Sequence, residues 1–353
     1  MGMFRFIFFP FSAIWGTFMY IRRSFYNKGR RITYHKPTVC VGNLCMGGSG
    51  KTPHIEYLIR LLEENHFISA VLSRGYGRKT KGFRFVDSSS SSKEVGDEPL
   101  LLCKKHTSIS VAVCKNRVEG LNKIYEKLPE INVVLLDDAY QHLLLKPGIS
   151  ILLTDYYHIY VEDFIFPVGN LREGKSAAKD ADIIIVTKSP RLIPTIEERI
   201  ILNKINPLPF QKVYFSYIEF GMMTPLTPKA KEIPLEDIRS AVAVCGIANP
   251  YPFLDYVKNI FKEKQQLVFS DHHQFTEKDI QEIRHCRERS MQKNCVVITT
   301  EKDAMRLSDG KLKKEVEELP IFYIPIKVKF HQKYQEGFEE QILKYVSKDK
   351  ERS

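Results

Sequence analysis

Residues 38–52 read T-V-C-V-G-N-L-C-M-G-G-S-G-K-T, and this stretch decides the fold class. The apolar run at 38–42 predicts a strand, and the segment 51–64 carries apolar residues at helical spacing. Between them, glycines let the backbone turn so tightly that its N–H groups face a phosphate, and the start of the helix adds a favourable positive end. The sequence therefore predicts a phosphate-binding loop (P-loop) between a strand and a helix.

The residues of the predicted P-loop are Gly47, Gly48, Ser49, Gly50, Lys51 and Thr52. In such loops the lysine, here Lys51, reaches the β- and γ-phosphates of a nucleotide, and the hydroxyl of Thr52 binds Mg²⁺. The usual pattern places a glycine where this chain has Cys45, so we expect the backbone to approach the loop differently.

An apolar strand that ends in acidic residues is a second indication of a nucleotide site. Residues 133–138 read V-V-L-L-D-D, and an aspartate at the end of a strand beside a P-loop is the usual Mg²⁺ ligand. Asp137 is the first candidate for binding the metal, and Asp138 is the second. His142 follows shortly after, and both lining the site and plain packing fit it.

Further apolar runs predict a parallel sheet. They are continuous rather than alternating, as in strands whose two faces are both covered by helices. These runs are 69–73, 108–113, 131–136, 149–154 and 183–187. With helical stretches between them, they predict an α/β fold in which a P-loop NTPase-like domain is built on a parallel sheet.

A smaller α/β domain is predicted after a proline-rich stretch near Pro207, Pro209, Pro225 and Pro228. Segments 212–220 and 322–330 alternate like exposed strands, so we expect them to pair as a two-stranded β linker between the domains. The expected boundaries are an N-terminal segment at 1–31, the P-loop domain at 32–210, the linker at 211–221 and 320–330, the smaller domain at 222–319, and a C-terminal helix and tail at 331–353.

The N-terminal segment predicts contact with a membrane surface. Residues 6–21 carry no charge, no acidic residue precedes Glu56, and a basic cluster follows the apolar run. The run is shorter than the ~20 residues that a bilayer crossing needs, and Pro10 is expected to interrupt it. We therefore expect an interfacial helix whose basic residues meet anionic headgroups, with packing on the protein's own core as the alternative.

Net charge limits the kinds of partner that the protein can bind, and cysteine content indicates the compartment in which it works. The formal net charge of +11 suits an anionic partner, but basic and aromatic residues gather only in the N-terminal segment, which suits lipid better than nucleic acid. The chain has seven cysteines and no C-x-x-C pair, which indicates buried free thiols in a reducing compartment. A zinc site at His272, His273 and Cys286 fits no usual ligand spacing.

Two polar clusters are candidates for the chemistry of transfer. Residues 96–99 read G-D-E-P and residues 270–273 read S-D-H-H. A kinase needs a group that orients or deprotonates the attacking hydroxyl, and an aspartate backed by a histidine across an interdomain cleft would do so. The alternatives are a helix N-terminus with acidic residues in its first turn for G-D-E-P, and a surface loop for D-H-H.

Taken together and in this order, the motifs resemble the tetraacyldisaccharide 4′-kinase (lipid A 4′-kinase) family. The matching pieces span most of the chain. They are VGNLCMGGSGKTP (41–53), LSRGYGR (72–78), VGDEP (95–99), CKNR (114–117), LLDDAYQH (135–142), PVGNLRE (167–173), VTK (186–188), CGIANP (245–250), SDHHQF (270–275) and TTEKDA (299–304). One piece departs slightly, since Ala139 stands where the resemblance leads us to expect glycine.

The resemblance implies transfer of the γ-phosphoryl group of ATP, with Mg²⁺, to the 4′-hydroxyl of a tetraacylated glucosamine disaccharide 1-phosphate in lipid A biosynthesis. It also implies two domains that close on the substrate through a two-stranded linker. The lipid A precursor and the membrane surface are the expected partners, and the expected location is peripheral, on the cytoplasmic face of the inner membrane. Nothing in the sequence indicates an oligomeric state.

The same resemblance assigns roles to residues. Asp97 is implied to be the catalytic base, assisted by a histidine that we assign to His272, with His273 as the alternative. Lys51 is expected to take part in catalysis and Glu173 to contact the nucleotide. Further residues of family motifs are expected to line the site or to bind phosphates: Arg74, Tyr76, Glu98, Arg117, His142, Asn170 and Arg172.

Two other functions compete with a lipid kinase. A regulatory or metal-delivery GTPase is suggested by Thr187-Lys188 and by residues 300–303, which partly match the guanine-reading N-K-x-D pattern, although neither has it in full. A nucleic-acid-binding ATPase is suggested by net charge alone. Comparing ATP with GTP binding separates the first of these from an ATP-dependent kinase.

Overall fold

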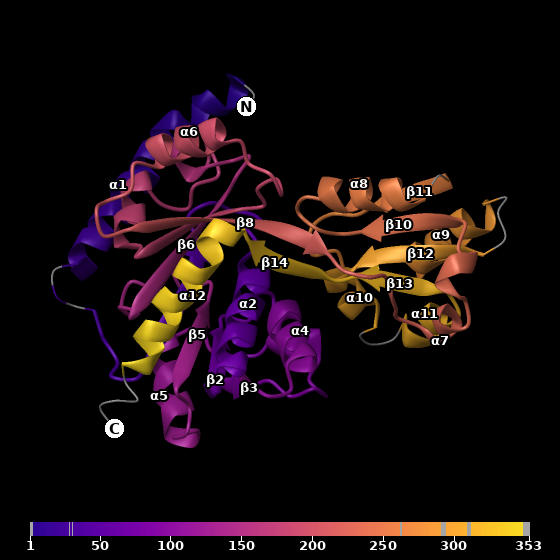
Figure 1. The fold of residues 1–353 in the computed structure, drawn as a ribbon, viewed down its shortest axis with the longest axis horizontal. Helices are drawn as coiled ribbons and strands as arrows, with labels where there is room; N and C mark the ends of the chain where they lie inside the picture. The colour runs from indigo at the N-terminus through magenta and orange to yellow at the C-terminus, as the bar shows by residue number, and fades with distance from the viewer. Residues whose placement is uncertain are drawn as a thin grey trace.

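The computed structural model describes residues 3–27, 29, 31–261, 263–290, 294–308 and 312–348. Within these residues the chain forms two α/β bodies that are joined by a two-stranded ribbon (Figure 1). The larger body contains a nine-stranded sheet and the smaller body a five-stranded sheet. This architecture confirms the predicted fold class.

The larger sheet has the strand order β14-β8-β7-β6-β1-β5-β2-β4-β3, and its central strands run parallel. Its first seven strands are β1 (Thr38–Asn43), β2 (Ser69–Ser73), β3 (Arg84–Phe85), β4 (Ser110–Val113), β5 (Val133–Asp137), β6 (Ile149–Asp155) and β7 (Ile183–Thr187). Every residue of β1, β2, β5 and β7 is buried. Burial on both faces explains why these strands read as unbroken apolar runs.

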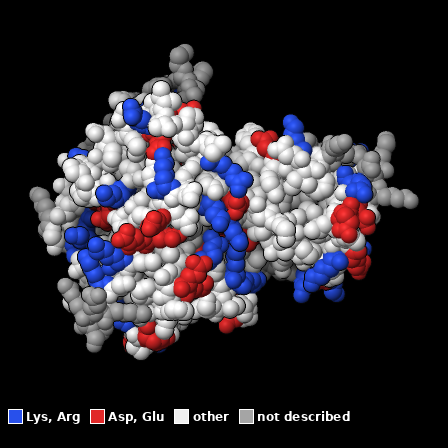
Figure 2. Space-filling model, viewed as in Figure 1, with Lys and Arg blue, Asp and Glu red and all other residues white. Residues whose placement is uncertain are grey.

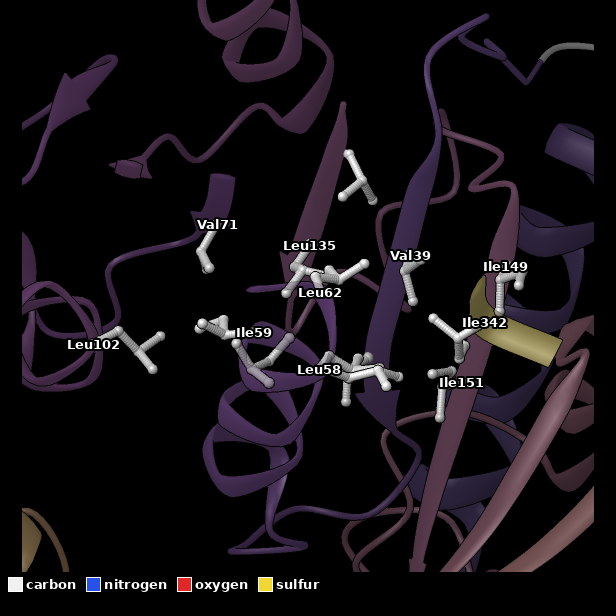
Figure 3. Close-up of a cluster of buried hydrophobic side chains, with 14 of the residues drawn as sticks. Val39, Leu58, Ile59, Leu62, Val71, Leu102, Leu135, Ile149, Ile151 and Ile342 are labelled. Carbon is white, nitrogen blue, oxygen red and sulfur yellow. The ribbon is translucent and has the colours of Figure 1, made fainter. Parts of the chain in front are cut away.

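One face of this sheet is covered by α2 (Lys51–Glu64), α4 (Asp97–Lys105) and α12 (Gln332–Ser347). Figure 3 shows Leu58, Ile59 and Leu62 of α2 in one apolar cluster with Val39 and Leu135 of the sheet. Burial of each such side chain stabilises the fold by about 1.5–3 kcal/mol. The P-loop therefore precedes a helix that is firmly packed on the core.

The opposite face is covered by α5 (Arg117–Lys127) and α6 (Thr195–Ile205), whose buried side chains join a second apolar cluster. The short elements of this body are α3 (Ser92–Val95), η2 (Tyr160–Glu162) and η3 (Lys175–Asp180). The C-terminal helix α12 is held to Ser347, because Phe338, Ile342 and Val346 are buried against the first face.

The smaller body follows the same α/β plan, with the strand order β11-β10-β12-β13-β9. Its elements are β9 (Thr224–Pro225), α7 (Pro228–Lys231), η4 (Leu235–Asp237), β10 (Ser240–Cys245), α8 (Tyr251–Ile260), β11 (Glu263–Val268), α9 (Glu277–Glu288), β12 (Cys295–Thr300), α10 (Glu301–Leu307), α11 (Lys313–Glu317) and β13 (Ile321–Ile324). Its four strands β10 to β13 run parallel, with β9 antiparallel at the edge.

The ribbon between the bodies consists of β8 (Lys212–Phe220) and β14 (Ile326–Phe330), which pair antiparallel. In Figure 1 both strands extend from the larger sheet to the smaller body. The expected linker at 320–330 is too long, because β13 pairs with β12 and belongs to the smaller sheet. Pro325 separates β13 from β14, since proline has no N–H to donate to a sheet.

The N-terminal segment forms η1 (Met3–Phe8) and α1 (Phe9–Asn27) on the outside of the larger body (Figure 1). Pro10 does not interrupt the helix as expected: it is the second residue of α1, where no helical hydrogen bond is lost. In the described residues, no helix combines the length and apolar character that crossing a membrane requires. Large apolar side chains are exposed along this segment: Ile7, Phe8, Phe9, Phe11, Ile14, Trp15, Phe18, Tyr20, Ile21 and Phe25.

Two arginines of this segment bind the larger body. Arg23 is buried, its Nε lies 2.9 Å from Oε2 of Glu173, and its guanidinium also pairs with Asp180. Arg31 lies 2.6 Å from the same carboxylate of Asp180. These two arginines therefore anchor α1 to the protein, which corrects their expected contact with lipid headgroups. Two other basic residues of the cluster lie outside the described residues: Lys28 and Arg30.

Candidate active site

The P-loop connects β1 to α2 in the predicted order. Gly47 and Gly50 adopt φ values of 109° and 86°, which a residue with a side chain rarely adopts. Gly50 is the residue directly before α2, and no side chain caps that end of the helix. The free N–H groups of the first turn of α2 are thus available to an anion.

The backbone that leads into the loop is extended around Cys45, where the usual pattern has a glycine. The backbone on either side of Cys45 pairs with the segment 170–172: N–H of Met46 donates to the carbonyl of Asn170 at 2.7 Å, and N–H of Arg172 donates to the carbonyl of Leu44 at 2.7 Å. Cys45 itself bridges Leu171. Because this stretch is extended and strand-like, it does not require glycine.

Two residues at the end of β7 hold the loop from its other side, namely its last residue, Thr187, and the residue that follows it, Lys188. The Thr187 hydroxyl donates to the carbonyl of Ser49 at 3.0 Å, and Nζ of Lys188 donates to the carbonyl of Gly48 at 2.5 Å. Thr187 and Lys188 suggested a guanine-reading motif in the sequence. In the structure they support the P-loop backbone instead, which removes that support for a GTPase.

The carboxylate of Asp138 faces two cations. It lies 3.6 Å from Nζ of Lys51 and 3.2 Å from Nη1 of Arg172, and Lys51 also approaches Oδ1 of Asn43 at 3.4 Å. The cations of Lys51 and Arg172, which are expected to bind phosphates, therefore lie together beside the P-loop. Both now face the carboxylate of Asp138, and a bound phosphate would take its place as their partner.

Asp137 lies at the end of β5 and is buried. Its Oδ2 accepts a hydrogen bond from Ser73 at 3.0 Å, whereas its Oδ1 has no hydrogen-bond partner among the described residues. Burial, reinforced by the charges of Glu98 and Asp138, raises the pKa of Asp137 to about 7. A bound cation would supply the missing partner and keep this carboxylate ionised.

Arg117 lies beneath these aspartates. Its buried guanidinium donates to the carbonyls of Asp137 and Asp138 at 3.2 and 3.1 Å, and to the carbonyl of Cys114 at 3.0 Å. The structure thus gives Arg117 a role in positioning the two aspartates, in place of the phosphate contact expected from the sequence. His142 is nearby, and burial and the charges of Arg117 and Arg22 lower its pKa to about 4, so its ring is neutral.

The predicted base, Asp97, is the first residue of α4 and faces the smaller body. Its Oδ2 lies 3.0 Å from Nε of Arg306 on α10 and 3.6 Å from Nδ1 of His272. The Nη2 of Arg306 also lies 3.1 Å from Nδ1 of His272. The expected Asp–His pair is therefore bridged by an arginine that the sequence analysis did not identify.

Arg306 is fixed inside the smaller body. Its Nη1 donates to Oδ1 of Asp303 at 2.7 Å and to the carbonyl of Gly246 at 2.9 Å, and the side chain is almost fully buried. Asp303 in turn accepts from the hydroxyl of Thr300 at 2.7 Å. The quoted motif TTEKDA ends two residues before Arg306, and the spacing of Asp303 and Arg306 on one helix is the only local signal for it.

The protonation states follow from these contacts. Burial alone would raise the pKa of Asp97, but its hydrogen bond with His272 and the charge of Arg306 outweigh that effect, so the pKa lies below its usual range. Asp97 is therefore an ionised carboxylate at neutral pH.

The structure separates the two neighbouring histidines. His273 stacks on Phe269 with ring centroids 4.6 Å apart, and its Nε2 lies 2.9 Å from Asp279 within the smaller body. His272 instead lies beside Asp97, and its ring is 5.7 Å from the ring of Tyr76. The geometry thus favours His272 as the assisting histidine.

Further ion pairs hold α4 against α10. Lys302 lies 2.5 Å from Glu98, and Lys105 lies 2.8 Å from Glu301 and 2.7 Å from Glu56 of α2. The charge of Lys302 outweighs the burial of Glu98 and lowers its pKa to about 2. Glu98 therefore joins the two bodies in this structure.

The remaining expected residues are placed as follows. The buried carboxylate of Glu173 binds Arg23 of α1, so its contact with a nucleotide stays a prediction. Asn170 supports the P-loop through its carbonyl, and Arg74 is exposed directly after β2. The described ranges contain no group of three or more His, Cys, Asp or Glu side chains placed to bind a metal ion, and the zinc site considered at His272, His273 and Cys286 is not formed.

Comparison with known proteins identifies the family. A family model described as tetraacyldisaccharide-1-P 4′-kinase matches residues 4–347. The chain belongs to the tetraacyldisaccharide-1-P 4′-kinase family. Relatives named tetraacyldisaccharide 4′-kinase include one from Flavobacterium johnsoniae, 39% identical over 355 residues (99% of this chain, 100% of that protein), and one from Bacteroides thetaiotaomicron, 38% identical over 351 residues (96% and 92%).

A solved structure of the same kinase family has a similar fold. It is the "apo" form of LpxK from Aquifex aeolicus in complex with ATP, with a TM-score of 0.73, 28% identity, and coverage of 98% of this chain and 100% of that chain. The resemblance that the motifs indicate is therefore confirmed, and the chain is an ATP-dependent kinase of this family.

Replacing Arg306 with glutamine is expected to raise the pKa of Asp97, because the cation that stabilises the carboxylate is lost while its burial remains. As the proposed base, Asp97 must be ionised to accept a proton, so the acidic limb of kcat/KM against pH is expected to move to higher pH. The measurement is a pH profile of kinase activity.

The matched control is Arg306→Lys, which keeps the charge and is expected to shift the acidic limb less. A profile of unchanged shape in Arg306→Gln, with kcat/KM lowered equally at every pH, would contradict a contact between Arg306 and the base.

Proposed function

We propose that the chain transfers the γ-phosphoryl group of ATP to the 4′-hydroxyl of a tetraacylated glucosamine disaccharide 1-phosphate. The observation that carries this proposal is that Asp97, Arg306 and His272 meet at the boundary between the bodies, directly beside Glu98, whose pKa is lowered in part by the charge of Lys51 of the P-loop. Family membership supplies the acceptor, since the matched relatives are named for it.

The P-loop residues bind the phosphates of ATP. Backbone N–H groups at the start of α2 face the phosphate oxygens. The ammonium group of Lys51 leaves the carboxylate of Asp138 and binds the β- and γ-phosphates instead. Asp137, with its unpartnered Oδ1, and the buried hydroxyl of Thr52 fit Mg²⁺, and Asp138 is close by. When bound, Mg²⁺ neutralises phosphate charge that develops during transfer.

Asp97 accepts the proton of the 4′-hydroxyl. The freed oxygen attacks the γ-phosphorus, the bond between that phosphorus and the β–γ bridging oxygen breaks, and ADP leaves. Arg306 and His272 orient the carboxylate, and the low pKa of Asp97 keeps it ionised and ready to accept the proton.

The smaller body also approaches the phosphate site directly. A side-chain Cβ added at Gly48 would lie only 3.8 Å from Cβ of Ala248, which belongs to the loop after β10. The face in Figure 2 carries Lys and Arg side chains, interspersed with acidic ones, along the border between the two bodies. Two bodies in contact over the phosphates limit access of water, and so favour transfer to a hydroxyl over hydrolysis.

The N-terminal segment is the proposed contact with the membrane in which the lipid acceptor resides. An open apolar groove of about 760 Å³ runs beside it, lined by Phe8, Phe11, Ile14, Trp15, Phe18, Phe166 and Pro167. An exposed apolar helix of this kind lies in the interface plane. The location that fits an ATP-dependent enzyme with a lipid acceptor is peripheral, on the cytoplasmic face of the inner membrane.

The direct test is incubation of the protein with labelled ATP, Mg²⁺ and tetraacyldisaccharide 1-phosphate, followed by separation of the lipid products. We expect a labelled bisphosphorylated lipid. Labelled inorganic phosphate as the sole product would overturn the proposed acceptor.

In the same assay, Asp97→Asn is expected to lower kcat by about 10²–10⁴-fold, the usual contribution of general-base catalysis, with ATP affinity within a few-fold of the unchanged protein. The matched control is Asp87→Asn, in an exposed loop of the same body. Full activity of Asp97→Asn would remove Asp97 from the mechanism.

Replacing Phe11, Ile14 and Phe18 together with serine is expected to weaken binding to anionic lipid vesicles by at least about tenfold, because each side chain buried in lipid contributes about 1.5–3 kcal/mol. The three side chains are exposed, so ATP affinity should stay unchanged. Co-sedimentation with vesicles measures the effect.

The control for this variant is Met222→Ser with Tyr251→Ser, which removes two exposed side chains from the linker region and the smaller body. Equal vesicle binding by the triple variant and the unchanged protein would refute the membrane role of α1.

A further inference from the structure

His54 lies one turn into α2 and makes hydrogen bonds with both ring nitrogens. Its Nδ1 lies 2.7 Å from the carbonyl of Gly50 in the P-loop, and its Nε2 lies 3.0 Å from the hydroxyl of Ser216 in β8. Since a carbonyl only accepts, Nδ1 carries the proton and Nε2 accepts from the Ser216 hydroxyl. The ring is buried, and burial lowers its pKa to about 4, which keeps it neutral.

Ser216 is the residue at which β8 changes its partner strand. Residues 212–215 pair in parallel with β7 of the larger sheet, and residues 216–220 pair antiparallel with β14. Beyond this point β8 leads to the smaller body (Figure 1). We call Ser216 and its partner Phe330 the root of the ribbon.

The root is tightly held on the side of the larger body. The carbonyl of Ser216 accepts hydrogen bonds from both N–H and Oγ of Ser189 at 3.0 Å, and Ser189 Oγ lies 2.8 Å from Nε2 of His331. Phe330 presents its ring edge-to-face to the imidazole of His54, with centroids 6.3 Å apart. His54 therefore contacts both strands of the ribbon where they leave the sheet.

Any rotation of the smaller body must bend this ribbon, because β8 and β14 carry both chain connections between the bodies. At the other end of the contact, Gly50 adopts a left-handed conformation, and its carbonyl belongs to the peptide that presents N–H of Lys51 to a phosphate. A phosphate bound there fixes the orientation of this peptide. A buried aromatic ring in a close-packed slot cannot absorb a shift at one end without moving its partner at the other.

We propose that His54 is a positioning residue that links nucleotide occupancy of the P-loop to the orientation of the smaller body, through the hydrogen bonds Gly50–His54–Ser216. The inference rests on the proposed function only in taking a nucleoside phosphate as the P-loop ligand. The link is reciprocal. If one orientation of the ribbon increases the affinity of the P-loop for nucleotide, then bound nucleotide must favour that same orientation.

The two ring nitrogens can be tested separately. In His54→Asn the side-chain amide stands in for Nδ1 and keeps the bond to Gly50, but it is too short to reach Ser216. Ser216→Ala removes the hydroxyl and leaves the histidine in place, so it cuts the same link from the ribbon side with little effect on folding. His35→Asn, at an exposed histidine, is the matched control.

The measurement is amide hydrogen exchange of peptides covering 212–222 and 326–331 in the full chain, with and without Mg·ADP. In the unchanged protein and in His35→Asn, we expect ADP to slow exchange in both peptides. In His54→Asn and Ser216→Ala, we expect ADP to bind within about threefold of the normal affinity, protecting the P-loop peptide while the ribbon peptides no longer respond.

Ribbon peptides that respond to ADP equally in Ser216→Ala and in the unchanged protein would overturn the proposal. So would a ribbon in the unchanged protein that does not respond to bound ADP. Neither result depends on the lipid acceptor: failure to phosphorylate tetraacyldisaccharide 1-phosphate overturns the proposed function and leaves the exchange result standing, whereas absence of ADP binding to the unchanged protein overturns both.

Discussion

The buried guanidinium of Arg306 is the constraint on which the arrangement of the two bodies depends. Asp303 fixes it within the smaller body, and it reaches across to Asp97 and holds His272 at the same point. Breaking a buried ion pair by removing one partner costs about 3–5 kcal/mol, so this arginine strongly favours the docked arrangement. The proposed base and its assisting histidine therefore form one unit only where α4 meets α10.

The groups around the phosphate site, in contrast, all come from one body. The larger body alone supplies the P-loop, the cations that face Asp138, and the buried Asp137 with an oxygen left unpaired. We propose that these groups bind the nucleotide. In the proposed mechanism, transfer requires the smaller body as well, because Arg306 and His272 come from it. Dividing the two tasks between two bodies ties phosphoryl transfer to docking, which protects ATP from hydrolysis.

The sequence predicted those parts of the site that depend on residues close together in the chain. The P-loop and the strand ending in Asp137 are such local patterns, and the structure has them where expected. Contacts between distant segments leave no local pattern: Arg306 lies 209 residues from Asp97, and Glu173 lies 150 residues from its partner Arg23. For the same reason the family resemblance indicated a base and a histidine, but gave neither the bridging arginine nor the anchoring of α1.

The central claim, that the arginine and the histidine act on the base as one unit, is tested most directly by a double-mutant cycle. The values to compare are kcat/KM for Arg306→Gln, His272→Asn and the double variant, at a pH above the acidic limb. Residues that act as a unit are strongly non-additive, so the double variant should lose roughly as much activity as the worse single variant. If the losses of the two single variants multiply in the double variant, the two side chains act independently and the account is contradicted.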